Sequence, residues 1–274
     1  MQIVRLMNRE DRKVAPAVTR ELPAIAQAVD GIVSRMYRGG RLIYVGSGTS
    51  GRLGVLDASE CPPTFGTSPE LVLAVIAGGQ KAVTEPVEGA EDDKRDARRR
   101  LAKLRLSAKD SVVGLAASGT TPYVLAAVAY AKKRGALAIG VAMNRNSPLA
   151  RLAHIAITPN VGPEVLTGST RLKAGTAQKM VLNMLSTATM VRRGHAYENL
   201  MIDVIRTNQK LRDRSKRILA EASGKSMSSV EHALRQSDHN LRVALIMLKR
   251  GVPAERAQKI LERAGGDLRR ALGE

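Results

Sequence analysis

The 274-residue sequence contains few aromatic side chains: no Trp, one Phe and five Tyr. Proteins that bind single-stranded nucleic acids stack the bases on aromatic side chains, so the sequence disfavours this class despite a net charge of +19. The single cysteine, Cys61, cannot form an internal disulfide. The four histidines are scattered and, with Cys61, lack the spacing of metal ligands. We therefore expect no metal and no nucleic-acid partner.

Long apolar runs are also missing, and none approaches the roughly 18 residues that a membrane-spanning helix needs. The start, MQIVRLMNREDRK, carries too many charges for a signal peptide. We expect no membrane association and a cytoplasmic location. What is present is a hydrophobic share of 44%, enough for a core, and 44 Lys and Arg against 25 Asp and Glu, which favours anionic ligands.

Short β-branched runs alternate with helix-length segments through most of the chain, which predicts an α/β fold with a doubly wound, five-stranded parallel sheet. Apolar spacing predicts a helical segment over 9–38, bent at its prolines, and a helix over 171–192. Strand-like runs disappear after about residue 204, which predicts a small all-α C-terminal domain. The predicted strands are 41–45, 71–77, 111–117, 136–142 and 154–158. The predicted domains are 1–31 (an N-terminal helical segment), 32–195 (the sheet domain) and 209–274 (the small helical domain).

Two predicted strands end in similar loops that are rich in glycine and hydroxyl groups. Glycine allows close approach of the backbone to an anion, and the first N–H groups of a following helix are donors without helical acceptors. At the carboxyl ends of parallel strands, such loops are typical of phosphate or sugar-phosphate binding. The loop residues are Ser47, Gly48, Thr49 and Ser50 in the first loop and Ser118, Gly119, Thr120 and Thr121 in the second.

Residues 46–51 also match G-x-G-x-x-G, a fingerprint of dinucleotide binding. That mode of binding requires an acidic residue at the end of the second strand. Here the second strand runs into Gly78 and Gly79, and Glu70 stands at its beginning. We therefore rank a sugar phosphate above NAD as the ligand.

Two carboxylates are candidates for acid–base chemistry. Glu60 stands before two prolines in 57–66, which we interpret as a stiff loop, and Glu91 lies in an acidic cluster after the second strand. If both segments lie over the strand ends, the two carboxylates face one pocket and divide the acid and base roles. Asp92 and Asp93 are better interpreted as the acidic first turn of a helix.

A third hydroxyl-rich helix entry, residues 162–176, adds Glu164, Ser169 and Lys173 as further candidate pocket residues. Cys61 has no histidine near it in sequence and follows an acid that opposes thiolate formation, so we interpret it as structural.

Four segments together resemble the N-acetylmuramic acid 6-phosphate etherase family, from about Ile3 to Leu272. The motifs ASECPPTFG and EVLTGSTRLKAGTAQK are long and specific. The segments are RLIYVGSGTSGRLGVLDASECPPTFG, AVIAGG with VEGAEDD, VVGLAASGTTPYV, and GPEVLTGSTRLKAGTAQKMVLNMLSTATM.

The resemblance implies a sugar isomerase-type domain, a ubiquitin-associated-like C-terminal domain and a homodimer with active sites near the subunit interface. It also implies cleavage of the lactyl ether of N-acetylmuramic acid 6-phosphate, giving N-acetylglucosamine 6-phosphate and D-lactate, in cell-wall recycling. By this resemblance Glu60 corresponds to the family's proton donor, and Glu91 corresponds to its second catalytic residue, the expected base. Phosphate and sugar hydroxyls would be held by the two hydroxyl loops. The implied reaction needs a general acid and a general base but no metal and no redox cofactor.

Two alternatives stay open on the residues alone. A non-catalytic phosphosugar sensor would use the same hydroxyl loops but has no chemical need for Glu60 and Glu91. An aldose–ketose phosphate isomerase would share the fold and a carboxylate base but would release no lactate.

Overall fold

The computed structural model describes residues 1–203 and 209–274, which form two compact units. Residues 1–59 and 68–187 make up the first, which we call the sheet unit. Residues 60–67 and the chain from 188 onward make up the second, which we call the helical unit. The division passes through two helices, α4 (Gly48–Phe65) and α9 (Lys173–Arg192), so the last residues of each belong to the helical unit.

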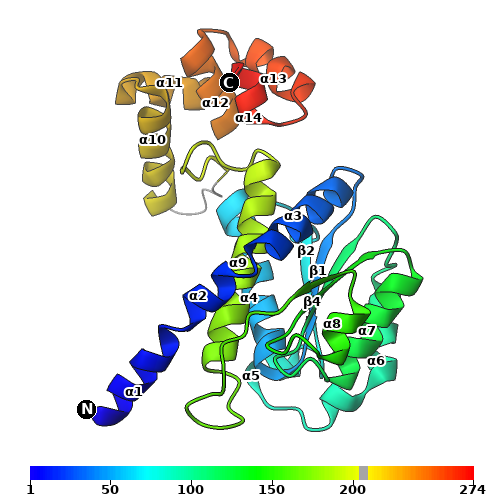
Figure 1. The fold of residues 1–274 in the computed structure, drawn as a ribbon. Coiled ribbons are helices and arrows are strands. Elements are labelled where there is room, and N and C mark those ends of the chain that lie inside the picture. The colour runs from blue at the N-terminus through cyan, green and yellow to red at the C-terminus, as the bar shows by residue number, and fades with distance from the viewer. Residues whose placement is uncertain (204–208) are drawn as a thin grey trace. The chain divides into compact units, whose positions relative to one another are not determined.

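Five parallel strands form the centre of the sheet unit, in the spatial order β2-β1-β3-β4-β5 (Figure 1). Strands β1, β3 and β4 are buried along their whole length and carry mainly aliphatic side chains, as expected of a sheet covered on both faces. The fold class predicted from the sequence is confirmed. The strands are β1 (Leu42–Gly46), β2 (Val72–Ile76), β3 (Ser111–Leu115), β4 (Leu137–Val141) and β5 (Ile155–Ile157).

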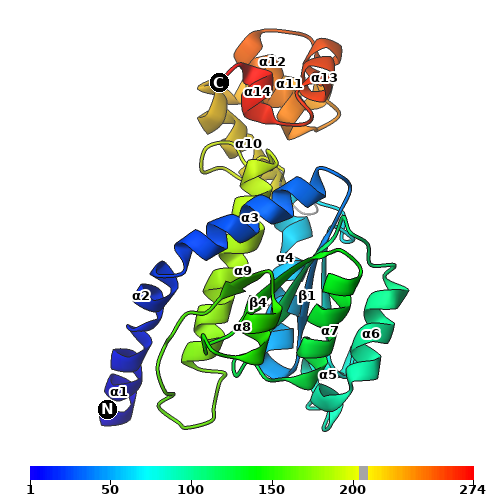
Figure 2. The ribbon, with the colours of Figure 1, turned by 45° about the vertical axis from the view of Figure 1, so that its right-hand side comes forward.

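Helices cover both faces of this sheet (Figures 1 and 2). Helices α6 (Lys94–Lys103), α7 (Pro122–Lys133) and α8 (Pro148–Leu152) pack on one face, where Leu101, Val124 and Leu149 share a buried core with strand residues such as Val112. The opposite face carries α3 (Leu22–Met36), α4 (Gly48–Phe65) and α9 (Lys173–Arg192). Two short elements, α5 (Lys81–Thr84) and the 3-10 helix η1 (Ala90–Asp92), connect β2 to α6.

The N-terminal segment is less continuous than the sequence pattern predicts. It forms α1 (Gln2–Asp11), α2 (Val14–Thr19) and α3 in place of one bent helix over 9–38. Helix α1 buries none of its residues and leaves Met1, Ile3 and Val4 exposed.

One buried carboxylate, Asp57, fixes α4 against its neighbours. It accepts hydrogen bonds from the Tyr44 hydroxyl (2.8 Å), the Asn183 amide (2.7 Å) and the Ser186 hydroxyl (3.1 Å). These donors come from β1 and α9, and buried polar groups are stable only when they are satisfied in this way. The hydrogen bonds of Asp57 to β1 and α9 therefore fix the direction of α4 after it leaves the sheet edge.

The helical unit contains five helices after residue 208. Its core is formed by aliphatic residues such as Val230, Leu234 and Leu245. Side chains of Ser226, Asn240 and Asp267 cap α11, α12 and α14. This part of the chain is helical, as the loss of strand patterns after residue 204 indicates. The helices are α10 (Gln209–Ser223), α11 (Met227–Gln236), α12 (Leu241–Arg250), α13 (Ala254–Arg263) and α14 (Leu268–Leu272).

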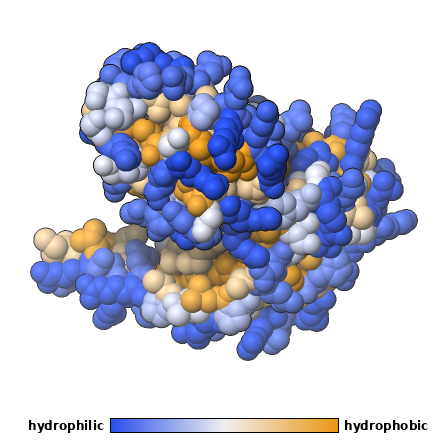
Figure 3. Space-filling view, turned by 90° about the horizontal axis from the view of Figure 1, so that it is seen from above, coloured by the Kyte–Doolittle hydropathy of each residue, from blue (hydrophilic) through white to orange (hydrophobic). Residues whose placement is uncertain are grey.

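Most of the surface in the view of Figure 3 is hydrophilic, as expected of a chain in which a quarter of the residues are charged. Within residues 1–203 and 209–274, no helix has both the length and the apolar character needed to cross a membrane.

Candidate active site

The turn from β1 into α4 requires glycine at two positions. Gly48 has a φ of +51°, and a Cβ at Gly46 would lie 2.6 Å from the backbone nitrogen of Gly51. Ser47 and Thr49 are half-buried beside these glycines. Because α4 begins here, its first N–H groups have no helical acceptor. The turn therefore offers backbone and hydroxyl donors to an anion.

The turn from β3 into α7 has the same character. Gly119 has a φ of +72°, and a Cβ there would lie 2.3 Å from the Ser147 side chain. The hydroxyl oxygens of Ser118 and Thr120 are 2.9 Å apart, and both side chains are exposed. Thr121 immediately precedes α7. This loop also presents hydroxyl groups at a helix N-terminus.

The structure brings these two loops together at one edge of the sheet. Gly46 at the end of β1 is paired with Leu115 at the end of β3. From β1 the chain moves to β2 on one side and then returns to β3 on the other, so the winding direction reverses between β1 and β3. Open α/β sheets bind their ligands at this point, outside the carboxyl ends of the strands.

The beginning of α9 lies against the first loop. A Cβ at Gly175 would be 3.6 Å from the Thr49 methyl group, and the Ser50 hydroxyl donates to the Gln178 side-chain oxygen over 2.9 Å. Gln178 is 1% exposed, and its Nε2 has no hydrogen-bond partner among the described residues. Leaving a buried amide donor unpaired is unfavourable, so Gln178 is a candidate ligand donor that sequence reasoning missed. The available signal was a polar residue on the otherwise apolar face that includes Ala177 and Val181.

The three candidates of segment 162–176 lie around the start of α9. The Glu164 carboxylate accepts from the backbone N–H groups of Lys173 (3.0 Å) and Ala174 (2.9 Å) and so caps the helix. Lys173 is 1% exposed, and its ammonium group is 2.8 Å from Glu10 of α1. Hydrogen bonds from Lys13 and Lys173 lower the pKa of Glu10 to about 2.

Glu164 and Lys173 thus hold α9 and α1 in place. Ser169 is half-buried in the turn before α9, where its N–H donates to Leu166. Contact of Glu164, Ser169 and Lys173 with substrate stays a prediction.

The interpretation of residues 57–66 as a loop is wrong, because α4 continues to Phe65 with both prolines inside it. Glu60 is exposed on this helix, twelve residues after Gly48. At 1.5 Å per residue this is about 18 Å along the helix axis from the glycine-rich turn. Helix α4 therefore leads away from the glycine-rich turn before it reaches Glu60, and contact of Glu60 with substrate stays a prediction.

Glu91 is exposed in η1, just before α6. Asp93 caps α6 by accepting from the backbone N–H groups of Arg95 (3.0 Å) and Asp96 (2.8 Å), which confirms its interpretation as part of an acidic helix start. Glu91 belongs to the sheet unit and Glu60 to the helical unit. Neither unit by itself brings the two carboxylates together.

Comparison with known families identifies the sheet unit. Residues 24–132 match the glucokinase regulatory protein N-terminal SIS domain, and residues 93–188 match the SIS domain. A phosphoheptose isomerase from Francisella tularensis has a similar structure, with a TM-score of 0.51 over 70% of this chain and 97% of that one. Its sequence identity of 18% shows a common fold only.

Sequence similarity to curated proteins extends over nearly the whole chain. An N-acetylmuramic acid 6-phosphate etherase from Yersinia pestis is 56% identical over 266 residues, which cover 97% of this chain and 90% of the relative. The protein of the same name from Yersinia pseudotuberculosis has the same identity and coverage.

Proposed function

The chain belongs to the N-acetylmuramic acid 6-phosphate etherase family, and from this membership we propose how it cleaves the lactyl ether of N-acetylmuramic acid 6-phosphate. The activity itself, that of a carbon–oxygen lyase, follows from 56% identity over 97% of the chain. The observation that carries the site assignment is the pairing of β1 with β3, which puts two hydroxyl-rich helix starts side by side.

The two loops bind the phosphorylated amino sugar. The phosphate accepts hydrogen bonds from the first N–H groups of α4 and from the hydroxyl groups of Ser47, Thr49 and Ser50, because a helix start favours an anion. Ser118, Thr120 and Thr121 bind the remaining phosphate oxygens or the sugar hydroxyls. The net charge of +19 adds a general attraction for a phosphorylated ligand.

The reaction proceeds by elimination followed by hydration. In the open-chain sugar the C2 proton is acidic because C2 is next to the C1 aldehyde, and Glu91 removes it as the base. The C3–O bond breaks, a C2–C3 double bond forms, and Glu60 protonates the departing lactyl oxygen. Water then adds its hydroxyl group to C3 and a proton to C2. The products are D-lactate and N-acetylglucosamine 6-phosphate.

A homodimer completes the site. Within one chain Glu60 lies about 18 Å along α4 from the loop that binds phosphate, so the Glu60 of one subunit serves the loops and Glu91 of the other. The exposed apolar side chains of α1, among them Ile3 and Val4, are suited to contact with a second copy. We place the enzyme in the cytoplasm, where its phosphorylated substrate would be retained.

The test is release of D-lactate from N-acetylmuramic acid 6-phosphate by the purified chain. Glu60→Gln and Glu91→Gln should each lower kcat by at least about 100-fold, since each removes an acid–base group. Glu88→Gln is the matched control, because Glu88 is an exposed glutamate three residues before Glu91, and its rate should stay near that of the parent. Substrate-induced thermal stabilisation of the parent without lactate release would indicate a phosphosugar sensor and contradict the proposal.

A further inference from the structure

The turn of α4 that carries Glu60 lacks part of the hydrogen bonding of an ordinary helix. Pro62 and Pro63 have no backbone N–H, so the carbonyls of Ala58 and Ser59 receive no helical hydrogen bond from them. In the sequence, Glu60 lies between these two residues and the two prolines. The position of its carboxylate therefore depends on what holds the end of the helix.

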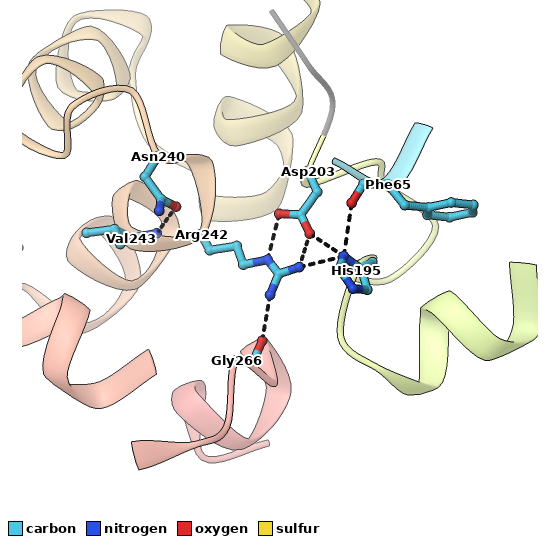
Figure 4. Close-up of polar contacts among 7 residues, drawn as sticks. All are labelled: Phe65, His195, Asp203, Asn240, Arg242, Val243 and Gly266. Carbon is cyan, nitrogen blue, oxygen red and sulfur yellow. Dashed lines mark hydrogen bonds and ion pairs between the residues drawn. The ribbon is translucent and has the colours of Figure 1, made fainter. Parts of the chain in front are cut away.

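The end of α4 is held by a loop of the helical unit. The His195 Nδ1 atom lies 2.9 Å from the carbonyl oxygen of Phe65, the last residue of α4 (Figure 4). Gly66, which follows with a φ of +62°, packs so closely that a Cβ there would lie 2.5 Å from the carbonyl oxygen of Asp203. A helix leaves its last carbonyls without helical donors, and His195 supplies one to Phe65.

An ion pair fixes His195 in turn. Asp203 Oδ2 is 2.8 Å from His195 Nδ1, and both oxygens of Asp203 contact the guanidinium of Arg242, with the Nε–Oδ1 pair at 2.6 Å. Arg242 comes from α12 and also donates to the carbonyl of Gly266 over 2.8 Å. The cluster therefore connects the end of α4 to two separate parts of the C-terminal helices, all within the helical unit.

The charges in this cluster determine which atom donates. Burial and the nearby charges of Arg242 and Arg193 lower the pKa of His195 to about 4, so the ring is neutral near pH 7. Two groups that can only accept, the Phe65 carbonyl and the Asp203 carboxylate, lie at Nδ1, together with one that can only donate, the Arg242 Nη2 atom at 2.8 Å. We assign the proton of the neutral ring to Nδ1, which then donates toward the two acceptors. Arg242 then pairs with Asp203, so the carboxylate next to the helix end has its counter-charge.

We propose that His195 is a positioning residue for Glu60, and that the Asp203–Arg242 pair of the helical unit keeps it in place. The inference rests on the proposed role of Glu60 as proton donor. It gives the C-terminal helices a function in the reaction: they hold the last turn of a proline-weakened helix, so that the carboxylate of Glu60 is presented in one position.

The test compares three full-length variants by D-lactate release. His195→Ala removes the donor and should lower kcat on the order of 10- to 100-fold with KM within about two-fold, because a small displacement of a reacting group is costly while the phosphate loops are unchanged. His195→Asn puts an amide N–H near the position of Nδ1 and should restore most of kcat.

Lys249→Met is the matched control within the helical unit. Lys249 pairs with Glu274 (3.0 Å) and lies over the ring of Tyr197, and these contacts do not include α4. Its kcat should stay near that of the parent even if its thermal midpoint falls. Equal losses of kcat in Lys249→Met and His195→Ala would overturn the proposal, because the effect would then be general destabilisation.

A double variant separates this inference from the function on which it rests. In a Glu60→Gln background, His195→Ala should have no further effect on the residual rate, since a positioning residue acts only through the group it positions. An additional ten-fold loss in that background would overturn the positioning role alone. Full activity of Glu60→Gln would instead reject the role of Glu60, and the inference with it.

Discussion

At the scale of single residues, the buried polar side chains are the features that the sequence pattern describes least well. His195 occurs in a loop that no motif marks, and Gln178, although it lies near the end of the EVLTGSTRLKAGTAQK motif, was not recognised as a candidate within it. In the structure Gln178 contacts Ser50 of the first hydroxyl loop, and His195 contacts the end of α4. Both contacts join residues more than a hundred positions apart, so only the folded chain reveals them.

Burial of His195 predicts a specific pH dependence of stability. Its pKa is about 4 in the folded protein, with Asp203, Arg242 and Arg193 around it, and about 6.5 when exposed. Between these values the unfolded chain binds a proton that the folded chain does not, so stability falls as the pH is lowered from about 6.5 to about 4. His195→Asn lacks this contribution, and its thermal midpoint should fall less steeply across that range.

The parent and His195→Asn are best compared in thermal unfolding scans at pH 7.5, 6, 5 and 4 in one buffer composition. Parallel midpoint curves would contradict the assigned neutral state of His195. Carboxylates outside this cluster affect both proteins alike, and Asp203 keeps its partner Arg242 in both, so the difference between the curves reports chiefly on the histidine.

At the scale of elements, the sequence predicts the sheet well and one helix poorly. All five strands lie within or overlap the apolar runs from which they were predicted, because buried parallel strands need continuous β-branched and aliphatic residues. The two glycine- and hydroxyl-rich turns are also where the pattern puts them. Local sequence is sufficient for such features.

The end of α4 could not be predicted in this way. Pro62 and Pro63 disfavour a helix locally, and the interpretation of 57–66 as a loop followed from that preference. Contacts of Asp57 with Tyr44 and α9, and of Phe65 with His195, are distant in sequence and outweigh it. For the same reason the sequence did not predict that Glu60 lies on a helix, although its residue type was recognised.

The attachment of α1 to α9 gives a prediction at this scale. Lys173 is buried and pairs with Glu10. Glu10 has a second partner, the more exposed Lys13. Glu10→Gln leaves a buried ammonium group without its counter-charge, while Lys173→Met removes that group and leaves Glu10 paired. We expect Glu10→Gln to lower the urea midpoint more than Lys173→Met does.

Asp11→Asn is the control, because it removes a neighbouring but exposed carboxylate of the same helix. Its midpoint should match that of the parent within error. A larger loss in Lys173→Met than in Glu10→Gln would mean that packing of the lysine stem, and not its charge, connects α1 to α9.

At the scale of the whole molecule, the two units divide the proposed chemistry between them. The sheet unit carries both hydroxyl loops and Glu91, and the helical unit carries Glu60 and the residues that hold it. In the dimer that we propose, the sheet unit of one chain meets the Glu60 of another, so each site depends on both subunits. Closed two-fold symmetry then gives two identical sites.

This arrangement predicts complementation between inactive variants. In a dimer of one Glu60→Gln chain and one Glu91→Gln chain, one site has lost both carboxylates and the other retains both. Random mixing makes half of the dimers hybrid, so co-expressed chains should recover about a quarter of the parental lactate release. Separately purified variants, mixed without exchange of subunits, should remain inactive. If both carboxylates of a site came from the same chain, each hybrid subunit would lack one of them and co-expression would restore nothing, so the assay decides directly whether Glu60 acts on its own chain or across the interface.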